Sequence, residues 1–355
     1  MKVVVGLSGG VDSSCAVARL KEAGHEVVAA TLLMQQGEVS VPSAEALTQA
    51  QELCDALGVP FVVRPMDEAF SRQVLNPFVD AYLEGRTPSP CVACNRYVKV
   101  AGLMAIADEV GADKVATGHY ISLVEGEDGV VRLARGADRA KDQSYFLCQL
   151  PPEWVPRLMA PLSLATKDQV RAYAKAASLK VAEAPDSQGV CFAPQGDYRA
   201  FLASRRPDAF EPGDIVDEEG RVVGHHSGVA GFTVGQRKGL AITDGAGPYF
   251  VTSVDAAARQ VQVARRKPPR ATRFEVEDLV TTLDLEALDP SKLSVQTHYR
   301  ARAVPARLVA AGEGRWQVQV EEPGVLAVPG QTAAFYGGDV VLGGATIAID
   351  KSVNE

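Results

Sequence analysis

Hydrophobic residues in the first half of the chain follow two alternating patterns. Short β-branched runs predict strands at 2–5, 26–33, 61–63 and 114–117. Apolar residues at helical spacing predict helices at 13–23, 44–57, 67–83, 98–110 and 166–177. Thr166 and Gln169 have the spacing of a capping box at the start of the last helix. This alternation predicts an α/β fold, a doubly wound parallel sheet with helices on both faces.

The pattern changes after about residue 198, where short alternating runs are separated by turns that contain glycine. These runs predict β-hairpins at 215–223, 249–264 and 306–320. We therefore expect an α/β domain at 1–198, a small central β-rich domain at 199–270 and a C-terminal barrel-like β domain at 271–355. The basic, proline-rich segment 265–273 (RRKPPRATR) is predicted to link the last two domains.

Composition is typical of a soluble globular protein. Of 355 residues, 46% are hydrophobic and 23% are charged, and the net charge is -8. These totals do not suggest a strongly basic nucleic-acid binder, although a local basic patch can still bind RNA. No run approaches the roughly 18 apolar residues of a membrane helix, and the start MKVVVGLSGG predicts a strand rather than a signal peptide. We expect a cytoplasmic protein with reduced thiols and no membrane partner.

The six cysteines are too sparse for a disulfide scaffold. Cys15, Cys54 and Cys148 lie in helical or apolar contexts, which predicts small buried core residues. Cys94, which forms a C-x-x-C pair with Cys91, and Cys191 lie near proline or glycine in sequence that predicts loops, where reactive groups are common. Taken alone, Cys94 and Cys191 fit buried thiols as well as reactive ones.

A glycine-rich loop joins the first predicted strand to the first predicted helix. Its residues are Gly6, Leu7, Ser8, Gly9, Gly10, Val11, Asp12 and Ser13. Glycines let the backbone approach a ligand, and successive N–H groups at a helix N-terminus bind phosphate. Asp12 suits such a site when Mg²⁺ accompanies the phosphates. The spacing matches neither the Walker loop nor the dinucleotide fingerprint.

Motifs along the chain carry a family resemblance. SGGVDS resembles the PP-loop of ATP pyrophosphatases, which implies cleavage of ATP to AMP and pyrophosphate. The further motifs are TPSPCVACN, ATGHY, KDQSYFL, DSQGVCF, GFTVGQRKGL and PGQTAAFY. Together they make the chain similar to the bacterial tRNA-specific 2-thiouridylase family from Gly6 to about Gly344. The resemblance implies thiolation of C2 of the wobble uridine in tRNAs for Lys, Glu and Gln, with sulfur from a carrier protein or a cysteine desulfurase.

The resemblance assigns Cys94 as the nucleophile and Cys191 as the carrier of a persulfide. The oxygen on uracil C2 is a poor leaving group, and adenylation by ATP makes it a better one. Sulfur released from the persulfide by thiol–disulfide exchange with the second thiolate can then replace it. The Cys191 loop, flanked by Pro185 and Pro194, is expected to swing toward Cys94.

Cys91 departs from the family pattern, because better-known members carry Asp there. The family mechanism treats that Asp as an acid/base helper, a part that Cys91 cannot play in the same way. Cys91, Cys94 and Cys191 instead supply three thiolates, enough to hold a [4Fe–4S] cluster with one open iron that could carry sulfide. The sequence leaves both routes open, the persulfide–disulfide relay and sulfide transfer from a cluster.

The resemblance also implies further ligand contacts. Met34 and Gly118 match ATP contacts, with a core methionine as the alternative for Met34. Contacts to tRNA are implied for Ser89, Pro90, Cys91, His119, Lys141, Asp142, Gln143, Tyr299, Arg300 and Gln331. Ordinary structural or surface roles are the alternative for the tRNA-contact residues. Segment 265–273 is predicted to contact tRNA phosphates, and we expect a monomer.

Two other functions fit part of the sequence. The loop alone would suit a PP-loop ligase or synthetase acting on a small metabolite, but the two loop cysteines, the basic segment and the β-rich half argue against it. A non-catalytic RNA-binding protein with a degenerate ATP site is disfavoured by the intact SGGVDS together with Cys94 and Cys191.

Overall fold

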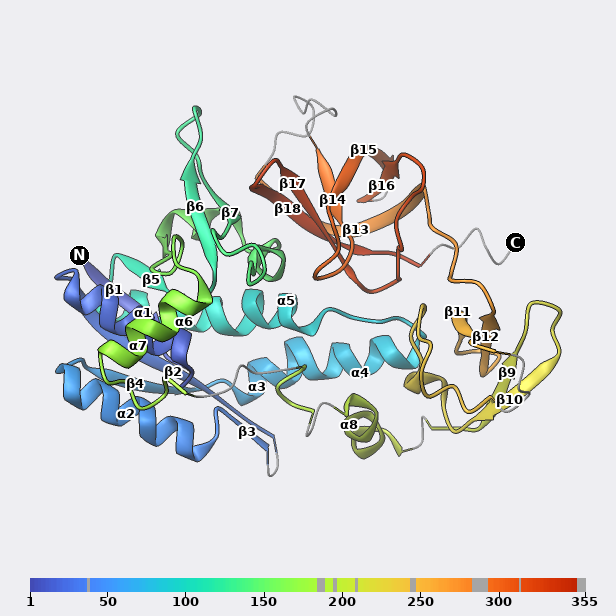
Figure 1. The fold of residues 1–355 in the computed structure, drawn as a ribbon, viewed down its shortest axis with the longest axis horizontal. Helices are drawn as coiled ribbons and strands as arrows, with labels where there is room; N and C mark the ends of the chain where they lie inside the picture. The colour runs from blue at the N-terminus through green and yellow to red at the C-terminus, as the bar shows by residue number, and fades with distance from the viewer. Residues whose placement is uncertain are drawn as a thin grey trace.

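The structure is a computed structural model. It describes residues 1–36, 39–183, 189–193, 197–207, 210–242, 247–282, 293–312 and 314–349. Pro185 and Pro194, expected to flank a moving loop, lie outside the described residues, as do residues 350–355 of the expected third domain. Figure 1 shows an α/β part at the left, a barrel at the upper right and a small sheet at the lower right.

Five parallel strands form the centre of the α/β part, in the order β4-β2-β1-β5-β8. Their bounds are β1 Lys2–Gly6, β2 Glu26–Gln36, β4 Phe61–Pro65, β5 Lys114–Ala116 and β8 Leu158–Met159. The short strand β3 (Val39–Val41) turns back antiparallel along the end of β2. The predicted parallel sheet is confirmed, and its strand order reverses between β1 and β5.

Helices cover both faces of this sheet. The helices of this part are α1 Val11–Glu22, α2 Ala44–Leu57, α3 Asp67–Phe70, α4 Asn76–Leu83, α5 Pro90–Cys94, α6 Ala101–Val110 and α7 Lys167–Ala176. Val3 and Val5 pack in one cluster with residues of α1 and α2, whereas Val4 packs in another with residues of α6. Because side chains alternate along a strand, this run of buried valines needs apolar cover on both sides.

The predicted loop around Cys94 is wrong. Residues 90–110 form one continuous helical run, in which the π-helix η2 (Asn95–Val100) joins α5 to α6. Pro90 occupies the first turn of α5, where proline is favoured because the amide it lacks would have no partner there. A second π-helix, η1 (Ser71–Leu75), joins α3 to α4 within the predicted helix at 67–83.

The second half is β-rich, as predicted. After α8 (Tyr198–Arg205), four strands form a sheet in the order β10-β9-β12-β11. Their bounds are β9 Gly213–Val216, β10 Val222–His226, β11 Phe250–Asp255 and β12 Gln260–Ala264. Two of the predicted hairpins, β9–β10 and β11–β12, are therefore confirmed.

The last six strands close into a barrel, because β13 pairs with both β16 and β18. Their bounds are β13 Arg273–Thr281, β14 Ser294–Gln296, β15 Val304–Gly312, β16 Arg315–Val320, β17 Thr332–Gly337 and β18 Val340–Ile347. The third predicted hairpin is β15–β16. A hairpin of the α/β part, β6 (Ile121–Glu125) and β7 (Val131–Arg135), extends this sheet beside β18 (Figure 1).

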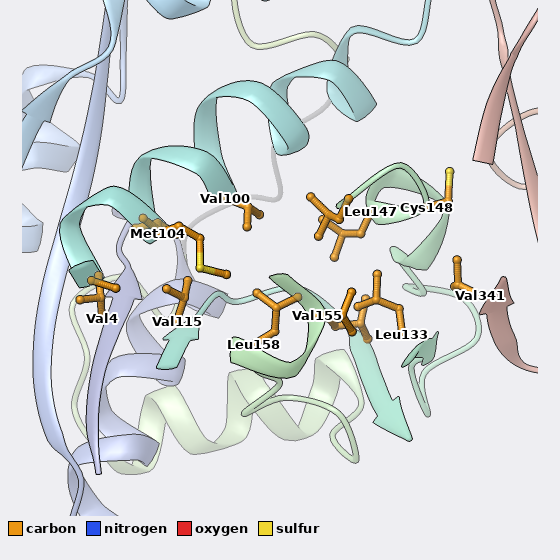
Figure 2. Packing of buried hydrophobic residues seen from close by; sticks show 14 of the residues in the cluster. Val4, Val100, Met104, Val115, Leu133, Leu147, Cys148, Val155, Leu158 and Val341 are labelled. Carbon is orange, nitrogen blue, oxygen red and sulfur yellow. The ribbon is translucent and has the colours of Figure 1, made fainter. Parts of the chain in front are cut away.

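One hydrophobic cluster crosses from the α/β part into the barrel. Figure 2 shows Val341 of β18 on the same side as Leu133 and Cys148, with Val4 and Val115 of the parallel sheet at the other end of the cluster. Cys15, Cys54 and Cys148 are all buried, as predicted. Within the described residues, no helix combines the length and the apolar character needed to cross a membrane.

Candidate active site

The glycine-rich loop joins β1 to α1 at the carboxyl edge of the parallel sheet. Gly10 precedes α1 in an extended conformation, and no side chain caps the first amides of that helix. Gly9 has a φ of 78°, and a Cβ there would lie 2.8 Å from the Ala46 carbonyl oxygen, so a larger residue does not fit. The hydroxyls of Ser8 and Ser13 lie 3.1 Å apart. This geometry suits an anion such as phosphate.

A second loop touches this one from β5. Gly118 follows β5, and a Cβ there would lie 2.7 Å from the backbone of Asp12 and Ser13. The loops after β1 and β5 therefore meet where the strand order reverses, which is where open α/β sheets bind ligands. Gly118, predicted as an ATP contact, lies directly against the phosphate loop.

Asp12 makes an ion pair that sequence analysis missed. Lys167 Nζ lies 2.8 Å from each Asp12 carboxylate oxygen, and the Tyr120 hydroxyl donates to Oδ1 at 2.7 Å. Lys167 is the first residue of α7, and its side chain is 10% exposed. The capping box located the start of α7, but no pattern in the sequence indicated that this position meets a loop 155 residues earlier.

Met34 takes the core position that was the alternative to its predicted ATP contact. It is 4% exposed, in a cluster that also contains Phe70, Cys94 and Phe192. Its backbone pairs with Val41 across β2 and β3. An adenine contact through Met34 stays a prediction.

The three cysteines predicted to be reactive lie in one neighbourhood. Cys91 and Cys94 are three residues apart on α5, whereas Cys191 lies in a turn; Cys94 is buried and the other two are exposed. Burial raises the pKa of Cys94 to about 12, Lys99 lowers it, and Cys191 and Cys91 raise it. Cys91 and Cys191 are exposed in part, yet the surrounding protein removes enough water to raise their pKa values, and Lys99 lowers both.

Lys99 is therefore a member of the site that sequence analysis missed. It lies five positions after Cys94 on the π-helix η2, whose wider turn returns at residue i+5 instead of i+4. Burial lowers the pKa of Lys99, but the three neighbouring thiols raise it more, and the net direction is upward. A helix of 3.6 residues per turn would have placed Lys99 on another face.

His119 connects the thiols to the phosphate loop. It follows Gly118, and its Nδ1 lies 2.7 Å from the Thr117 hydroxyl. Burial, and then the charge of Lys99, lower the pKa of His119 to about 3, so its imidazole is neutral at pH 7. His119 thus lies next to Gly118, which touches the phosphate loop, and within reach of the charge of Lys99, which also acts on the cysteines.

An aromatic cluster holds the residue next to Cys191. The Phe192 ring lies 5.0 Å from Phe78, 4.8 Å from Phe201 and 6.0 Å from Phe70, measured between centroids. Phe192 is 3% exposed. Such ring pairs stabilise by about 0.5–1.5 kcal/mol each beyond burial. The Cys191 turn is therefore anchored in this structure beside the thiols of α5.

Two of the predicted tRNA contacts, Asp142 and Gln143, have their side chains engaged inside the protein. Asp142 accepts hydrogen bonds from Arg135 Nη1 at 2.9 Å, from the Gly136 amide at 3.0 Å and from the Ser144 hydroxyl at 2.9 Å. Gln143 Oε1 accepts from the Tyr120 amide at 3.0 Å. Both carboxylate oxygens of Asp142 thus have protein donors, while Lys141 is partly buried.

The predicted contacts from the barrel reach the same region. Gln331 hydrogen-bonds to the segment that contains Ser89 and precedes Pro90, Cys91 and Cys94. The Tyr299 ring packs 4.4 Å from the ring of Phe146. Arg300 is exposed, with a φ of 71°, a region that non-glycine residues adopt rarely and often at functional sites.

Comparisons with known proteins agree with this architecture. Family models described as the tRNA methyl transferase HUP domain, the tRNA methyl transferase PRC-barrel domain and the aminomethyltransferase beta-barrel domain match residues 1–195, 199–265 and 271–347. The tRNA-specific 2-thiouridylase of Chloroflexus aurantiacus is 42% identical over 352 residues, 98% of each chain. The protein of the same name from Sorangium cellulosum is 44% identical over 357 residues, 98% of this chain and 92% of the other.

The chain belongs to the tRNA-specific 2-thiouridylase family. The full-length relatives decide this assignment, because they match across all three parts of the chain and share one name. Among solved structures, a 4-thiouridine synthetase–RNA complex with bound ATP is 17% identical over 58% of this chain and 50% of its own, with a TM-score of 0.35. That likeness is too distant to bear on the assignment. The predicted family and the predicted fold are thus confirmed.

The residues that the structure describes do not form a ready set of ligands for the expected Mg²⁺ ion or [4Fe–4S] cluster. Asp12 already hydrogen-bonds to Lys167 through both oxygens, so Mg²⁺ would have to displace an ammonium group. Across the part of the chain that the structure describes, no group of three or more His, Cys, Asp and Glu side chains is placed to hold a metal ion, Cys91, Cys94 and Cys191 included. These residues as placed do not fit a metal centre.

Proposed function

We propose that the protein is an ATP-dependent tRNA-uridine 2-sulfurtransferase acting on the wobble uridine of tRNAs for Lys, Glu and Gln. One observation carries the proposal. The α/β part holds both a phosphate loop, which Gly118 touches, and three cysteines near Lys99, and the charge of Lys99 also reaches His119, the residue after Gly118. Activation of an oxygen by ATP and its replacement by sulfur need these two kinds of group side by side.

The chemistry has two stages. In the first, the uridine O2 attacks the α-phosphorus of ATP at the loop, which forms an O-adenylated uridine and releases pyrophosphate. Backbone amides at the N-terminus of α1 would bind the phosphates, and Lys167 is the nearby cation that can help to neutralise them. We expect ATP to enter with Mg²⁺ coordinated by its own phosphates.

In the second stage, Cys191 carries a persulfide supplied by a sulfur-carrier protein or a cysteine desulfurase. The Cys94 thiolate attacks the inner sulfur, which forms a Cys94–Cys191 disulfide and releases hydrosulfide. Hydrosulfide adds to C2 of the adenylated uridine, and AMP leaves with the former O2, which gives 2-thiouridine. An external thiol then reduces the disulfide and restores both cysteines.

Release of pyrophosphate tests the first stage. The proposal expects pyrophosphate from ATP only when a substrate tRNA is present. Cys94→Ser and Cys191→Ser should each abolish thiolation while the dissociation constant for tRNA stays unchanged. Pyrophosphate release with a small acid and no tRNA would instead indicate a synthetase, and loss of tRNA binding in both variants would make the cysteines structural.

Iron content distinguishes the relay from a cluster mechanism. The relay uses two thiols, whereas a [4Fe–4S] cluster needs Cys91, Cys94 and Cys191 as ligands to iron. Anaerobic purification followed by iron analysis and visible absorbance should yield an active, iron-free enzyme. Activity that depends on bound iron would overturn the relay.

Binding of tRNA is proposed to use residues around the site and in the barrel. The candidates are Pro90, Cys91, His119, Lys141, Asp142, Gln143, Tyr299 and Arg300, with the basic segment 265–273 for phosphates. Ser89 and Gln331 were also predicted, but their polar atoms bond to each other and to the backbone. We also expect a cytoplasmic protein, because the substrate is tRNA and the relay starts from reduced thiols. A monomer remains our expectation for its oligomeric state.

A further inference from the structure

The segment 85–89 is the place where all three parts of the molecule meet. It connects α4 to α5 and leads directly to Cys91 and Cys94. On one side it touches the small sheet: Thr87 Oγ1 lies 3.3 Å from Thr233 Oγ1, and a Cβ on Gly85 would lie 2.8 Å from the Val254 carbonyl oxygen. We refer to 85–89 as the junction segment.

On its other side the junction segment is bonded to a turn of the barrel at 329–332. The Thr87 amide donates to the Pro329 carbonyl at 2.8 Å, and the Thr332 amide donates to the Ser89 hydroxyl at 3.1 Å. A Cβ on Gly330, whose φ is 87°, would lie 3.1 Å from the Thr87 backbone. The two segments are therefore packed backbone to backbone.

The Gln331 side chain supplies the remaining bonds. Its Nε2 donates to the Thr87 carbonyl at 2.9 Å and to the Pro88 carbonyl at 3.3 Å. Its Oε1 accepts from the Ser89 hydroxyl at 3.4 Å. The carboxamide thus bonds three consecutive residues of the junction segment.

Ser89 links this contact to the cysteines. It occupies the N-cap position of α5, yet its side chain makes no capping bond to its own helix. Its hydroxyl instead bonds to Thr332 and Gln331 of the barrel. A serine at this position normally accepts from an amide of its own first turn. The barrel turn, rather than the first turn of α5, therefore takes up the Ser89 hydroxyl and ties the start of this helix to the barrel.

We propose that Gln331 is a positioning residue for sulfur transfer, because it holds the junction segment and through it the helix that carries Cys91 and Cys94. The inference rests on the proposed function for the identity of the reaction. Ser89 and Gln331 were predicted as tRNA contacts, but here their polar atoms bond to each other and to the backbone. Their loss should therefore slow a step at Cys94 rather than weaken tRNA binding.

Gln331→Glu tests the proposal with little change of shape. A carboxylate replaces both N–H donors with an oxygen that repels the Thr87 and Pro88 carbonyls. We expect single-turnover thiolation at saturating tRNA to slow by about ten- to a hundredfold, since a small misplacement of a reacting group has effects of that order. The dissociation constant for tRNA should stay within about twofold. Gln319→Glu is the control and should react as wild type, because Gln319 lies on β16 of the same barrel and its side chain hydrogen-bonds to Gln317.

Ser89 provides a second pair of variants. Ser89→Ala removes the hydroxyl that bonds to Gln331 and Thr332, whereas Ser89→Thr keeps it. We expect slow thiolation in Ser89→Ala and recovery in Ser89→Thr. The effects of Ser89→Ala and Gln331→Glu should be less than additive in the double variant, because both variants weaken the Ser89–Gln331 contact. An increased dissociation constant for tRNA with an unchanged saturated rate would overturn the proposal and make Gln331 an RNA contact.

Alkylation of Cys94 separates this inference from the proposed function. Iodoacetamide labelling of Cys94, followed by mass spectrometry, needs neither tRNA nor ATP. The proposal expects the rate in Gln331→Glu to differ at least about threefold from wild type, with Gln319→Glu unchanged and both variants folded by thermal melting. Equal rates in all three proteins would overturn it. If wild type fails to thiolate tRNA while the labelling rates still differ, the proposed function fails and the positioning role stands.

Discussion

At the scale of single residues, two lysines lie near reactive or charged groups of the site: Lys99 near Cys94, and Lys167 against Asp12. Burial raises the pKa of Cys94 to about 12, even though the charge of Lys99 lowers it. The Cys94 thiol is therefore protonated at pH 7 in the free protein, although a thiolate is needed for attack. We expect the Cys94 thiolate to form once the substrate or the persulfide is bound, and the positive charge of Lys99 to stabilise it.

Lys99→Met tests that role. Removal of the positive charge raises the pKa of Cys94 further, so the thiolate fraction falls and alkylation by iodoacetamide slows at every pH below about 12. In wild type the alkylation rate should rise about tenfold per pH unit between pH 7 and 10, without a plateau, because the thiolate is the reactive form. Arg96→Met, on the same π-helix, serves as a control. An unchanged rate in Lys99→Met would show that Lys99 does not act on Cys94.

Lys167→Met addresses the phosphate loop. Loss of the ammonium leaves the Asp12 carboxylate with the Tyr120 hydroxyl but without a compensating positive charge, so this negative charge faces the incoming phosphates. A hydrogen bond to a charged group contributes about 1.5–3 kcal/mol, which corresponds to about a ten- to hundredfold weaker affinity for ATP. Calorimetric titration with ATP measures the effect. The control is Lys175→Met, because Lys175 is exposed near the other end of α7, and this variant should bind ATP as wild type does. If Lys167→Met also binds ATP with the wild-type affinity, Lys167 is only a structural partner of Asp12.

At the scale of elements, the aromatic cluster and the π-helix together create the thiol site. The cluster around Phe192 joins α3, α4 and α8 to the Cys191 turn. The π-helix turns Lys99 toward Cys94. Neither feature is chemically reactive, yet each determines which groups become neighbours.

Phe192→Ala should separate Cys191 from Cys94. Loss of a buried Phe side chain costs about 3–5 kcal/mol of stability, part of it as local opening of the Cys191 turn. We expect a diamide-induced Cys94–Cys191 disulfide to form more slowly, as followed by mass spectrometry of quenched samples. Phe274→Ala, in the barrel core, loses a buried ring without touching the turn and should form the disulfide at the wild-type rate. The same rate in all proteins would mean that the cluster does not position Cys191.

At the scale of the whole molecule, the barrel and the α/β part are one packed unit. Arg135 of β7 donates to Asp142 and to Gln296 of β14, each at 2.9 Å, and its guanidinium lies 3.8 Å from the centroid of the Tyr336 ring. The cluster in Figure 2 continues through the same region. The barrel is thus fixed relative to the cysteines, which a reaction on one base of a large RNA requires.

The basic segment 265–273 belongs to the same scale, because it lies between β12 and β13 on a chain with a net charge of -8. Arg265, Arg266 and Lys267 are exposed. Their triple replacement by alanine should weaken tRNA binding and reduce the slope of log K against log salt by roughly 0.7–0.9 for each phosphate that the protein no longer neutralises. Filter binding over a salt series measures the slope. The control replaces three exposed cations elsewhere, Lys21, Arg72 and Lys175, with alanine and should leave the slope unchanged. If the slope also stays unchanged in the 265–267 triple variant, these residues do not contact tRNA phosphates.

Local patterns in the sequence were enough to determine several features of this protein. The buried valines of β1, the glycines of the phosphate loop, the capping box of α7 and the three hairpins all depend on residues close together in the chain. Periodicity and turn chemistry report such local preferences directly. The family resemblance singled out Cys94 and Cys191 as candidate reactive cysteines, because the motifs that carry the resemblance are also local.

Only the tertiary structure decided which of these residues meet. The pairs Asp12–Lys167 and Ser89–Gln331 join positions 155 and 242 residues apart, and no local preference encodes such contacts. The helix around Cys94 was missed because proline and small residues predict a loop, whereas proline in the first turn of a helix is favoured. The π-turn was missed because hydrophobic periodicity assumes 3.6 residues per turn. Long-range packing therefore brought together, in one candidate site, residues that the sequence could only name separately.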